Sequence, residues 1–210
     1  MGIYLNPDHT DFQRSLNSEI YIDKTELIAY TNKKLNTEQC YICVSRPRRF
    51  GKSMAANMLT AYYSRGCDSK KMFQNLKIAK SADFEKYLNQ YNVIHLNMQN
   101  YLTEAKTVQQ LIQFIEEDLL DELEQEFSEL RMPRRKTLVK VLEQTFAQFR
   151  IPFIFVIDEW DCIFRVHKND LESQKLYLDF LRNLLKDQSY VALAYMTGIL
   201  PIKKYGEHSA

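Results

Sequence analysis

The sequence lacks any long apolar run, a signal peptide and a strong charge imbalance. No stretch of apolar residues approaches the ~20 needed to cross a membrane as a helix. The first residues, MGIYLNPDHTDF, contain no basic region followed by an apolar core, so we do not expect them to act as a secretory signal. The formal net charge is only +1, which gives no global field that would indicate nucleic acid or a membrane as partner. These absences make the cytoplasm the expected location.

Cysteine is also scarce, with four residues in the chain. Cys40 and Cys43 have the C-x-x-C spacing of some redox and zinc sites. They lie in or beside an expected strand, however, where residues three apart point to opposite faces. Cys67 and Cys162 are isolated, and the four histidines show no metal-ligand spacing. We therefore expect ordinary reduced cysteines and no metal site of cysteine or histidine.

What the sequence does contain is typical of a globular domain. Its 210 residues suit one domain that can bury most of its apolar surface. Hydrophobic residues make up 45% and aromatic residues 12% of the chain, which argues against disorder. No internal repeat or low-complexity segment interrupts it.

The stretch from Cys40 to Ser53, CYICVSRPRRFGKS, has the arrangement of a phosphate-binding loop. An apolar strand over 41–44 is followed by a turn, then by Gly51-Lys52-Ser53 and a helical pattern. In such a loop the backbone amides and the helix N-terminus point at phosphates. Lys52 would reach the β- and γ-phosphates, and the Ser53 hydroxyl would bind Mg²⁺. We predict that the nucleotide-binding residues are Arg46, Pro47, Arg48, Arg49, Phe50, Gly51, Lys52 and Ser53.

One position departs from the usual phosphate-binding loop. Glycine normally stands six residues before the lysine, and this chain has Arg46 there. The loop is therefore stiffer and more basic than usual. The alternative interpretation is a basic surface loop that precedes a helix and happens to contain Gly-Lys-Ser.

A second set of residues completes the predicted phosphate chemistry. Residues 153–157, FIFVI, form the most apolar run in the chain and predict a central strand covered on both faces. The run ends in Asp158, which can hold Mg²⁺ opposite Ser53, and Glu159, which can activate a water. The alternative is that both carboxylates only cap the next helix. Together with the separate Gly-Lys-Ser loop, however, the pair favours a nucleoside-triphosphate site.

Two further strands and several helices complete the predicted fold. Strands are expected over 93–96 and 191–196, and Thr197 at the tip of the latter is placed to sense a γ-phosphate or orient the water. An ordinary threonine in a strand-end turn remains the alternative. The alternation of strands and helices predicts an α/β, three-layer P-loop NTPase fold: a mostly parallel sheet with helices on both faces.

The helical segments carry three local predictions. The helix after the loop is expected to end near Gly66, which suits a C-cap. A long amphipathic helix should extend from Val108 to Leu130, with an acidic outer face that we expect to be solvated rather than to dock a basic partner. Pro133 sits where a new helix can start.

Several segments of the chain resemble the motifs of one protein family. The string Ser45–Ser53 is similar to the variant Walker A loop of bacterial AAA-ATPase-like proteins, in which a PD-(D/E)XK nuclease-like domain commonly follows. The segments 21–25, 156–161 and 197–199 also resemble motifs of that family, in the same order. Arg46 is thus a departure from P-loop proteins in general and not from this family.

The resemblance implies ATP and Mg²⁺ as ligands. It carries Lys52 and Ser53 over as Walker A residues, Asp158 and Glu159 as Walker B residues, and Thr197 as the sensor. Catalysis would then involve Glu159, Lys52 and Thr197, and the metal would be held by Ser53 and Asp158. Asp23 and Lys24 precede the first strand, near where an adenine could sit. A nucleic-acid partner is implied only through the family's nuclease link.

The sequence also leads us to expect a shortened domain. A fifth strand beside the first would come after Thr197, but residues 199–202 and the polar tail give no convincing strand. The helical lid and its arginine are not found, so we expect a fragment or truncated product with a possible open edge on the first strand. We divide the chain into an N-terminal extension, 1–38, packed on an ATPase core, 39–210.

Three function classes remain open from the sequence. The first is an ATPase whose cycle drives a partner protein, a second copy or a downstream domain. The second is a nucleotide-binding switch or interaction module with little turnover. The third, a small-molecule kinase, is disfavoured because phosphorylation of a hydroxyl does not need a water-activating Glu159 beside Asp158.

Overall fold

Four parallel strands form the centre of the molecule, which we describe from a computed structural model covering residues 2–200. The strands are β1 (Tyr41–Ser45), β2 (Asn92–Asn97), β3 (Phe153–Asp158) and β4 (Val191–Gly198). Their order across the sheet is β1-β4-β3-β2. All four predicted strands are confirmed, and β4 is inserted between the strand before the Gly-Lys-Ser loop and the strand that ends in Asp158.

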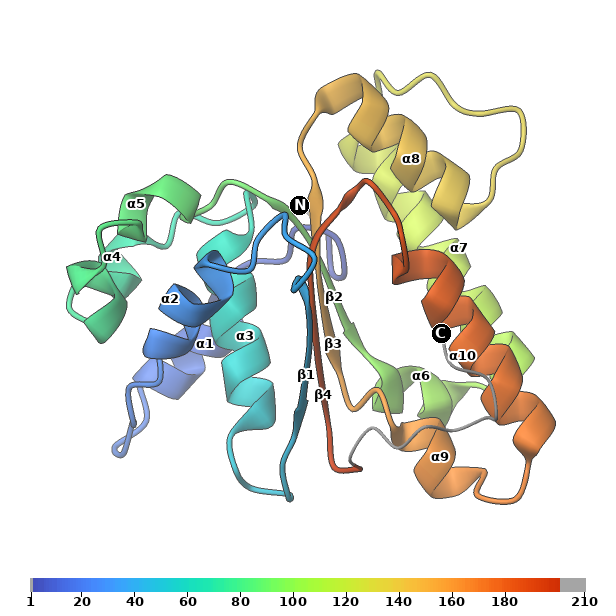
Figure 1. Cartoon of the computed structure of the whole chain (residues 1–210), viewed down its shortest axis with the longest axis horizontal. Helices are drawn as coiled ribbons and strands as arrows, with labels where there is room; N and C mark the ends of the chain where they lie inside the picture. Colours follow the sequence, from blue (N-terminus) through green and yellow to red (C-terminus); the bar gives the residue numbers. More distant parts are fainter. Residues whose placement is uncertain (1, 201–210) are drawn as a thin grey trace.

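Helices cover both faces of this sheet, as Figure 1 shows. One face carries α1 (Thr10–Leu16), α2 (Glu26–Asn32), α3 (Lys52–Tyr63), α4 (Lys70–Phe73), the 3-10 helix η1 (Lys77–Lys80) and α5 (Phe84–Tyr87). The other face carries α6 (Met98–Glu104), α7 (Val108–Glu126), α8 (Leu138–Phe149), α9 (Cys162–Val166) and α10 (Leu171–Leu185). The three-layer α/β prediction is therefore confirmed.

The central strands are buried because both of their faces are covered. Every residue of β3 is buried, as the run of apolar side chains from Phe153 to Ile157 predicts. Alternate residues of β3 enter two separate cores: Phe153, Phe155 and Ile157 pack with α7, α8 and α10, whereas Ile154 and Val156 pack with α3. This alternation fixes which strand residues reach each face.

The segment before α1 pairs with the outer edge of β2. Leu5 forms an antiparallel bridge with Ile94, and the backbone N–H of His95 donates to the Tyr4 carbonyl at 2.9 Å. The Glu122 carboxylate on α7 accepts hydrogen bonds from the backbone N–H groups of Ile3, Tyr4 and Leu5. The acidic face of α7 was predicted to be solvated, and Glu122 is an exception because it binds this segment.

Three helix boundaries differ from the sequence predictions. The helix after the loop ends at Tyr63, before Gly66. Gly66 is needed for a different reason, since a Cβ there would lie 2.3 Å from the Asn6 carbonyl oxygen.

Helix α7 ends at Glu126, and the next helix begins at Leu138 instead of Pro133. Leu130 is nevertheless buried, so it contributes to the core from outside a helix.

Several sequence expectations concern the end of the chain and the cysteines. Within residues 2–200, β1 forms an outer edge of the sheet and no strand follows β4. The part of the tail from 201 to 210 lies outside the described residues.

All four cysteines are free, with Cys40 and Cys43 in the cores on opposite faces. None of the described helices has the length and apolar character that crossing a membrane requires.

Candidate functional site

The loop between β1 and α3 is shaped by two residues with positive φ. Arg49 has φ 69° and Gly51 has φ 74°, and α3 begins at the next residue, Lys52. This left-handed conformation is easy for glycine because it has no Cβ. It turns the chain directly into the first turn of α3, whose N-terminal backbone N–H groups have no partner within the helix.

The two residues that open α3 have different surroundings. Lys52 is only 8% exposed, and its Nζ donates a hydrogen bond to the Pro47 carbonyl at 3.2 Å. Ser53 is exposed at the same end of the helix. The ammonium group thus lies within the curve of its own loop, while the hydroxyl of the next residue is open to solvent.

The rest of the loop is exposed and strongly basic. All residues from Arg46 to Phe50 are exposed, and none of the three loop arginines makes an ion pair with a described residue. The backbone N–H of Arg46 donates to the Gly198 carbonyl at 3.1 Å, which ties the loop to the end of β4. From the segment before α2, Lys24 Nζ donates to the Phe50 carbonyl at 3.2 Å.

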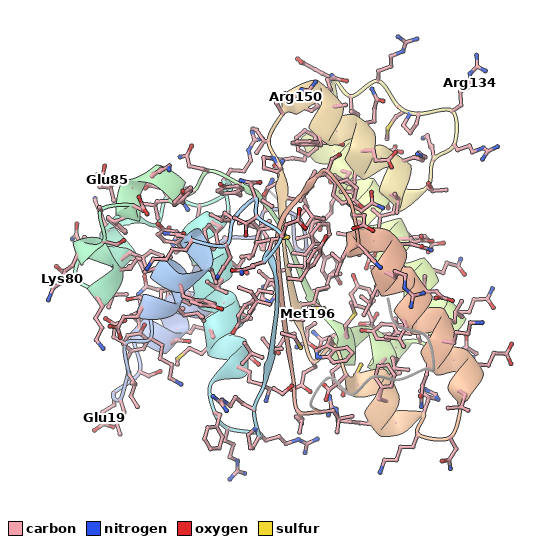
Figure 2. All side chains as sticks on the ribbon, in the orientation of Figure 1. Glu19, Lys80, Glu85, Arg134, Arg150 and Met196 are labelled. Atoms are coloured by element: carbon pink, nitrogen blue, oxygen red, sulfur yellow. The ribbon has the colours of Figure 1, made fainter. Side chains whose placement is uncertain are left out.

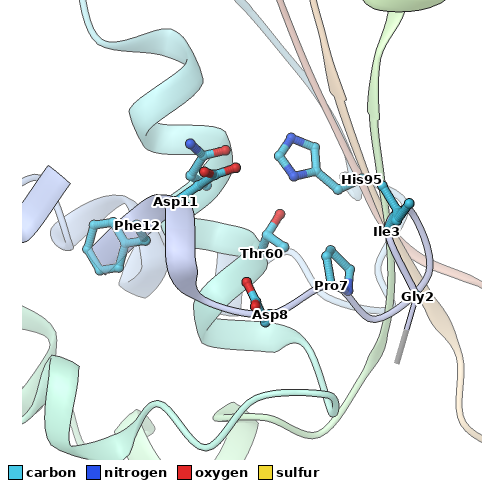
Figure 3. Close-up of a pocket in the computed structure, with 9 residues that line it drawn as sticks. Gly2, Ile3, Pro7, Asp8, Asp11, Phe12, Thr60 and His95 are labelled. Atoms are coloured by element: carbon cyan, nitrogen blue, oxygen red, sulfur yellow. The ribbon is translucent and has the colours of Figure 1, made fainter. Parts of the chain in front are cut away.

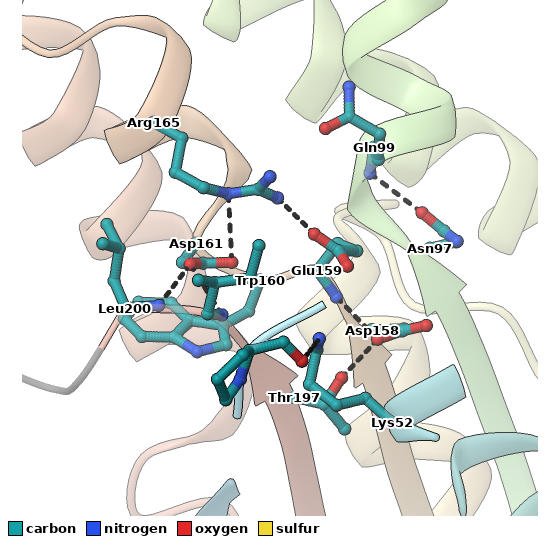
Figure 4. A network of polar contacts seen from close by, with 12 residues as sticks. Lys52, Asn97, Gln99, Asp158, Glu159, Trp160, Asp161, Arg165, Thr197 and Leu200 are labelled. Atoms are coloured by element: carbon teal, nitrogen blue, oxygen red, sulfur yellow. Dashed lines mark hydrogen bonds and ion pairs between the residues drawn. The ribbon is translucent and has the colours of Figure 1, made fainter. Parts of the chain in front are cut away.

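Asp158 and Thr197 meet at the carboxyl ends of β3 and β4. Asp158 is 1% exposed and Thr197 is fully buried. The Thr197 hydroxyl donates a short hydrogen bond to Asp158 Oδ1, which also accepts from the Glu159 N–H at 3.0 Å (Figure 4). Strand register pairs Thr197 with Val44 of β1, so this pair lies at the same edge of the sheet as the start of the loop.

Glu159 turns away from this pair. Its backbone has φ 55°, a left-handed conformation that is uncommon for a residue with a side chain. Its carboxylate forms an ion pair with the guanidinium of Arg165 on α9 (Figure 4). Arg165 Nε also lies 3.5 Å from Oδ1 of Asp161, which is fully buried. Glu159 is thus held by a cation on the helix that follows it.

Asp161 connects the end of β4 to this network. Its Oδ2 accepts hydrogen bonds from the backbone N–H groups of Ile199 at 2.9 Å and Leu200 at 2.7 Å. Asp161 is also the residue before α9, but its side chain makes no cap hydrogen bond there. It instead fixes the chain immediately after Gly198.

Burial shifts the ionisation of groups behind the site. Burial, with a smaller contribution from Asp158, raises the pKa of Tyr195 to about 12. Burial lowers the pKa of the His95 imidazole, and Asp158 and Asp11 act in the opposite direction. Both side chains are therefore neutral at pH 7, and the charge at this edge of the sheet comes from carboxylates, lysines and arginines.

The structure brings most of the sequence-predicted residues to one edge of the sheet. Lys52 and Ser53 open the helix after β1, while Asp158 and Thr197 are in direct contact at neighbouring strand ends. Glu159 lies beside them, but its carboxylate is paired with Arg165. Asp23 is engaged with Thr25 and with the backbone N–H of Lys77, at 2.7 Å, on η1.

Sequence reasoning missed Arg165 as a member of this network. The only available signal was spacing, because Arg165 follows Asp161 by four residues in a short helical pattern and so lies on the same helix face. The contact of Asp161 with Ile199 and Leu200 spans 38 and 39 residues and gave no local signal.

Comparison with known proteins gives one match. A family model described as "Predicted AAA-ATPase" matches residues 9–206. No curated protein and no solved structure gives a significant match. The match covers nearly the whole chain, including the loop and all four strands, and agrees with the P-loop NTPase-like fold. The chain belongs to the predicted AAA-ATPase family.

Proposed function

We propose that the chain binds Mg-ATP at the β1–α3 loop and hydrolyses it. The observation that carries the proposal is the meeting of the loop, the Asp158–Thr197 pair and the N-terminus of α3 at one edge of the sheet. Ligands of open α/β sheets bind at the carboxyl ends of the strands. The family membership supports a nucleotide as the ligand.

The loop residues would act on the phosphates. The unpartnered N–H groups at the start of α3 and its dipole favour an anion. Lys52 would exchange the Pro47 carbonyl for phosphate oxygens, which are charged and therefore stronger acceptors. The exposed arginines at positions 46, 48 and 49 would add positive charge to the loop, and the first of them stands where a typical loop has glycine.

The donor set also fits Mg²⁺. Ser53 supplies a hydroxyl oxygen and Asp158 a carboxylate whose Oδ2 makes no hydrogen bond with a described residue. Magnesium prefers oxygen ligands, and in nucleotide sites one or two carboxylates, water and phosphates hold it. No three metal-binding side chains come together among the described residues, so water and phosphates would have to supply the remaining ligands. Bound there, the ion would neutralise charge that develops on the phosphates.

Hydrolysis would require a change at Glu159. A carboxylate acts as a general base only when it is within hydrogen-bond reach of the attacking water. The Glu159 carboxylate is held by Arg165, so we propose that the pair opens when the enzyme turns over. The Thr197 hydroxyl, which now donates to Asp158, would help to orient the water or the γ-phosphate.

The same ion pair favours a second candidate function. If Arg165 keeps Glu159 paired in the ATP-bound form, the protein is a nucleotide-binding switch or interaction module with little turnover. In either case we propose that the nucleotide state acts on a partner protein, a second copy or a nuclease-like domain. We retain the division into an extension, 1–38, and a core, 39–210, as part of this proposal.

Thermal unfolding with and without Mg-ATP tests the proposal. Ligand at 100 times its dissociation constant adds about 2.7 kcal/mol, which raises Tm by roughly 5–10 °C for a domain of this size. We expect this shift in the wild type and in Lys80→Ala, a control that removes an exposed lysine on η1 (Figure 2). We expect no shift in Lys52→Ala.

Phosphate release then separates the two candidate functions. Turnover in the wild type that is lost in Glu159→Gln, with ATP binding retained, supports the ATPase. Binding without phosphate release supports the switch. Equal ATP-induced shifts in the wild type and Lys52→Ala would exclude this loop as the nucleotide site.

A further inference from the structure

A polar cavity lies on the α3 face of the sheet, two helical turns away from the loop. Its volume is about 290 Å³, and it is bounded by the N-terminal segment, α1, α3 and β2 (Figure 3). Thr60, which lines it, follows Ser53 by seven residues, about 10 Å along the helix axis. The cavity is therefore separate from the proposed nucleotide site and does not depend on it.

The inner wall of the cavity contains polar groups without partners. Thr60 is 2% exposed, and its hydroxyl has no hydrogen-bond partner among the described residues. Figure 3 shows this hydroxyl pointing into the space between Asp11 and His95. His95 also lines the cavity and is half-buried, and no hydrogen bond within residues 2–200 involves its ring. A buried hydroxyl without a partner costs free energy, so its presence requires an explanation.

The rim of the cavity is acidic. Asp8 and Asp11 contribute two carboxylates, and Asn57 contributes an amide one turn before Thr60. Asp8 accepts from the backbone and hydroxyl of Thr10, whose N–H lies 2.8 Å from it, so it remains ionised. Asp11 also makes a 3.4 Å contact with Arg14, which is largely exposed, and the lining residues include no lysine or arginine. The cavity is thus net negative.

The inner groups accept hydrogen bonds and carry no charge that would repel a cation. Because burial lowers the pKa of His95, its imidazole is neutral at pH 7 and has one acceptor nitrogen. Thr60 also provides an acceptor oxygen, and Asn57 provides another at the rim. Apolar surface from Pro7 and Phe12 lies beside these groups and suits a short methylene chain. No three metal-binding side chains gather here in the described part of the chain, which disfavours a bare metal ion.

We propose that this cavity binds a small aliphatic amine. Its ammonium group would donate hydrogen bonds to Thr60 and His95 in the interior, and the Asp8 and Asp11 carboxylates would balance its charge. An ammonium has three donors and no acceptor, which matches a wall of acceptors. A bound amine would give the unpartnered Thr60 hydroxyl a hydrogen-bond partner.

Calorimetric titration with three probes of equal length tests this site. The probes are 1,4-diaminobutane, 1,4-butanediol and succinate, which differ only in their charged or polar ends. We expect the full chain to bind the diamine alone. We expect Thr60→Val and Asp8→Asn/Asp11→Asn each to weaken binding by about tenfold or more, as loss of a hydrogen bond to a charged group predicts.

Two controls separate the site from folding and from the nucleotide loop. Valine has the shape of threonine without the hydroxyl, so Thr60→Val should keep or raise Tm while amine binding becomes weaker. Lys52→Ala should bind the diamine as the wild type does. Binding of succinate or butanediol in place of the diamine would overturn the proposal. So would the absence of diamine binding, which would mean a water-filled recess only, or binding that is equal in all variants.

Discussion

The carboxylate of Glu159 is paired with the guanidinium of Arg165, six residues further along the chain. Both side chains are largely buried, with 21% and 17% of their surfaces exposed. The pair lies beside the Asp158–Thr197 contact, yet it directs the Glu159 carboxylate toward α9. Under the proposed function, this contact decides how readily Glu159 reaches an attacking water.

We predict that Arg165→Gln raises turnover without changing ATP affinity. If opening the pair costs about 1 kcal/mol, its loss should increase kcat about fivefold. Steady-state phosphate release and equilibrium ATP binding, measured in parallel, check the prediction. Arg182→Gln, which removes an exposed arginine of α10 paired with Asp179, is the matched control. A lower kcat in Arg165→Gln would mean that Arg165 positions Glu159 for catalysis instead of restraining it.

The sequence was sufficient to predict the sheet because its strands have strong local signals. The run from Phe153 to Ile157 is apolar throughout, and the strand before the loop is followed at once by Gly51 and Lys52. Boundaries in the connecting segments were less accurate. Leu130 fits the apolar period of α7 but packs into the core after the helix has ended, so periodicity alone extended the helix too far.

The partners of the candidate site could not be predicted in the same way. Contacts such as Asp161 with Leu200 join residues far apart in sequence, and no local pattern encodes them. The first 20 residues showed little pattern, yet Leu5 is 1% exposed and bridges to β2. The structure of that segment depends on its pairing with the edge strand β2, and the sequence of the segment alone does not reveal that pairing.

The N-terminal segment provides a prediction about Glu122. Its two carboxylate oxygens accept from Ile3, Tyr4 and Leu5, at distances down to 2.6 Å. Glu122→Gln replaces one acceptor oxygen by a donor, so these backbone groups should lose about 1–2 kcal/mol of protection. Hydrogen exchange of residues 3–5 should then be faster by roughly five- to thirtyfold. Asp121→Asn makes the same charge change at an exposed neighbour and should leave the exchange rate of residues 3–5 unchanged.

Asp161 provides a prediction about stability. It is fully buried, and its Oδ2 satisfies two backbone N–H groups just after β4. Asp161→Asn weakens these charge-assisted bonds and removes a partner of Arg165, so we expect a loss of about 1–3 kcal/mol in the free energy of unfolding. Urea denaturation measures it, with Asp179→Asn on the surface of α10 as control. A loss below about 0.5 kcal/mol, typical of surface changes, would contradict the assigned role.

Cys162 predicts how stability depends on alkaline pH. The residue is fully buried, and burial raises the pKa of its thiol to about 12. An unfolded thiol has a pKa of about 8.5, so above about pH 9 the folded chain keeps a proton that the unfolded chain loses. Because the folded state then binds more protons, stability falls as pH rises, by about 1.4 kcal/mol per pH unit for this group.

Replacing the thiol isolates this effect from packing. Cys162→Ala should unfold more easily at pH 7 but show a shallower loss of stability between pH 9 and 10, where most unfolded tyrosines are still protonated. Ile163→Ala, a loss of buried side-chain volume at the adjacent position, should also be less stable but keep the wild-type pH slope. Urea unfolding across this pH range measures both slopes. A group that has the same pKa in the folded and unfolded states does not make stability depend on pH. If Cys162→Ala kept the wild-type dependence of stability on pH, the folded state would therefore not hold the Cys162 thiol protonated.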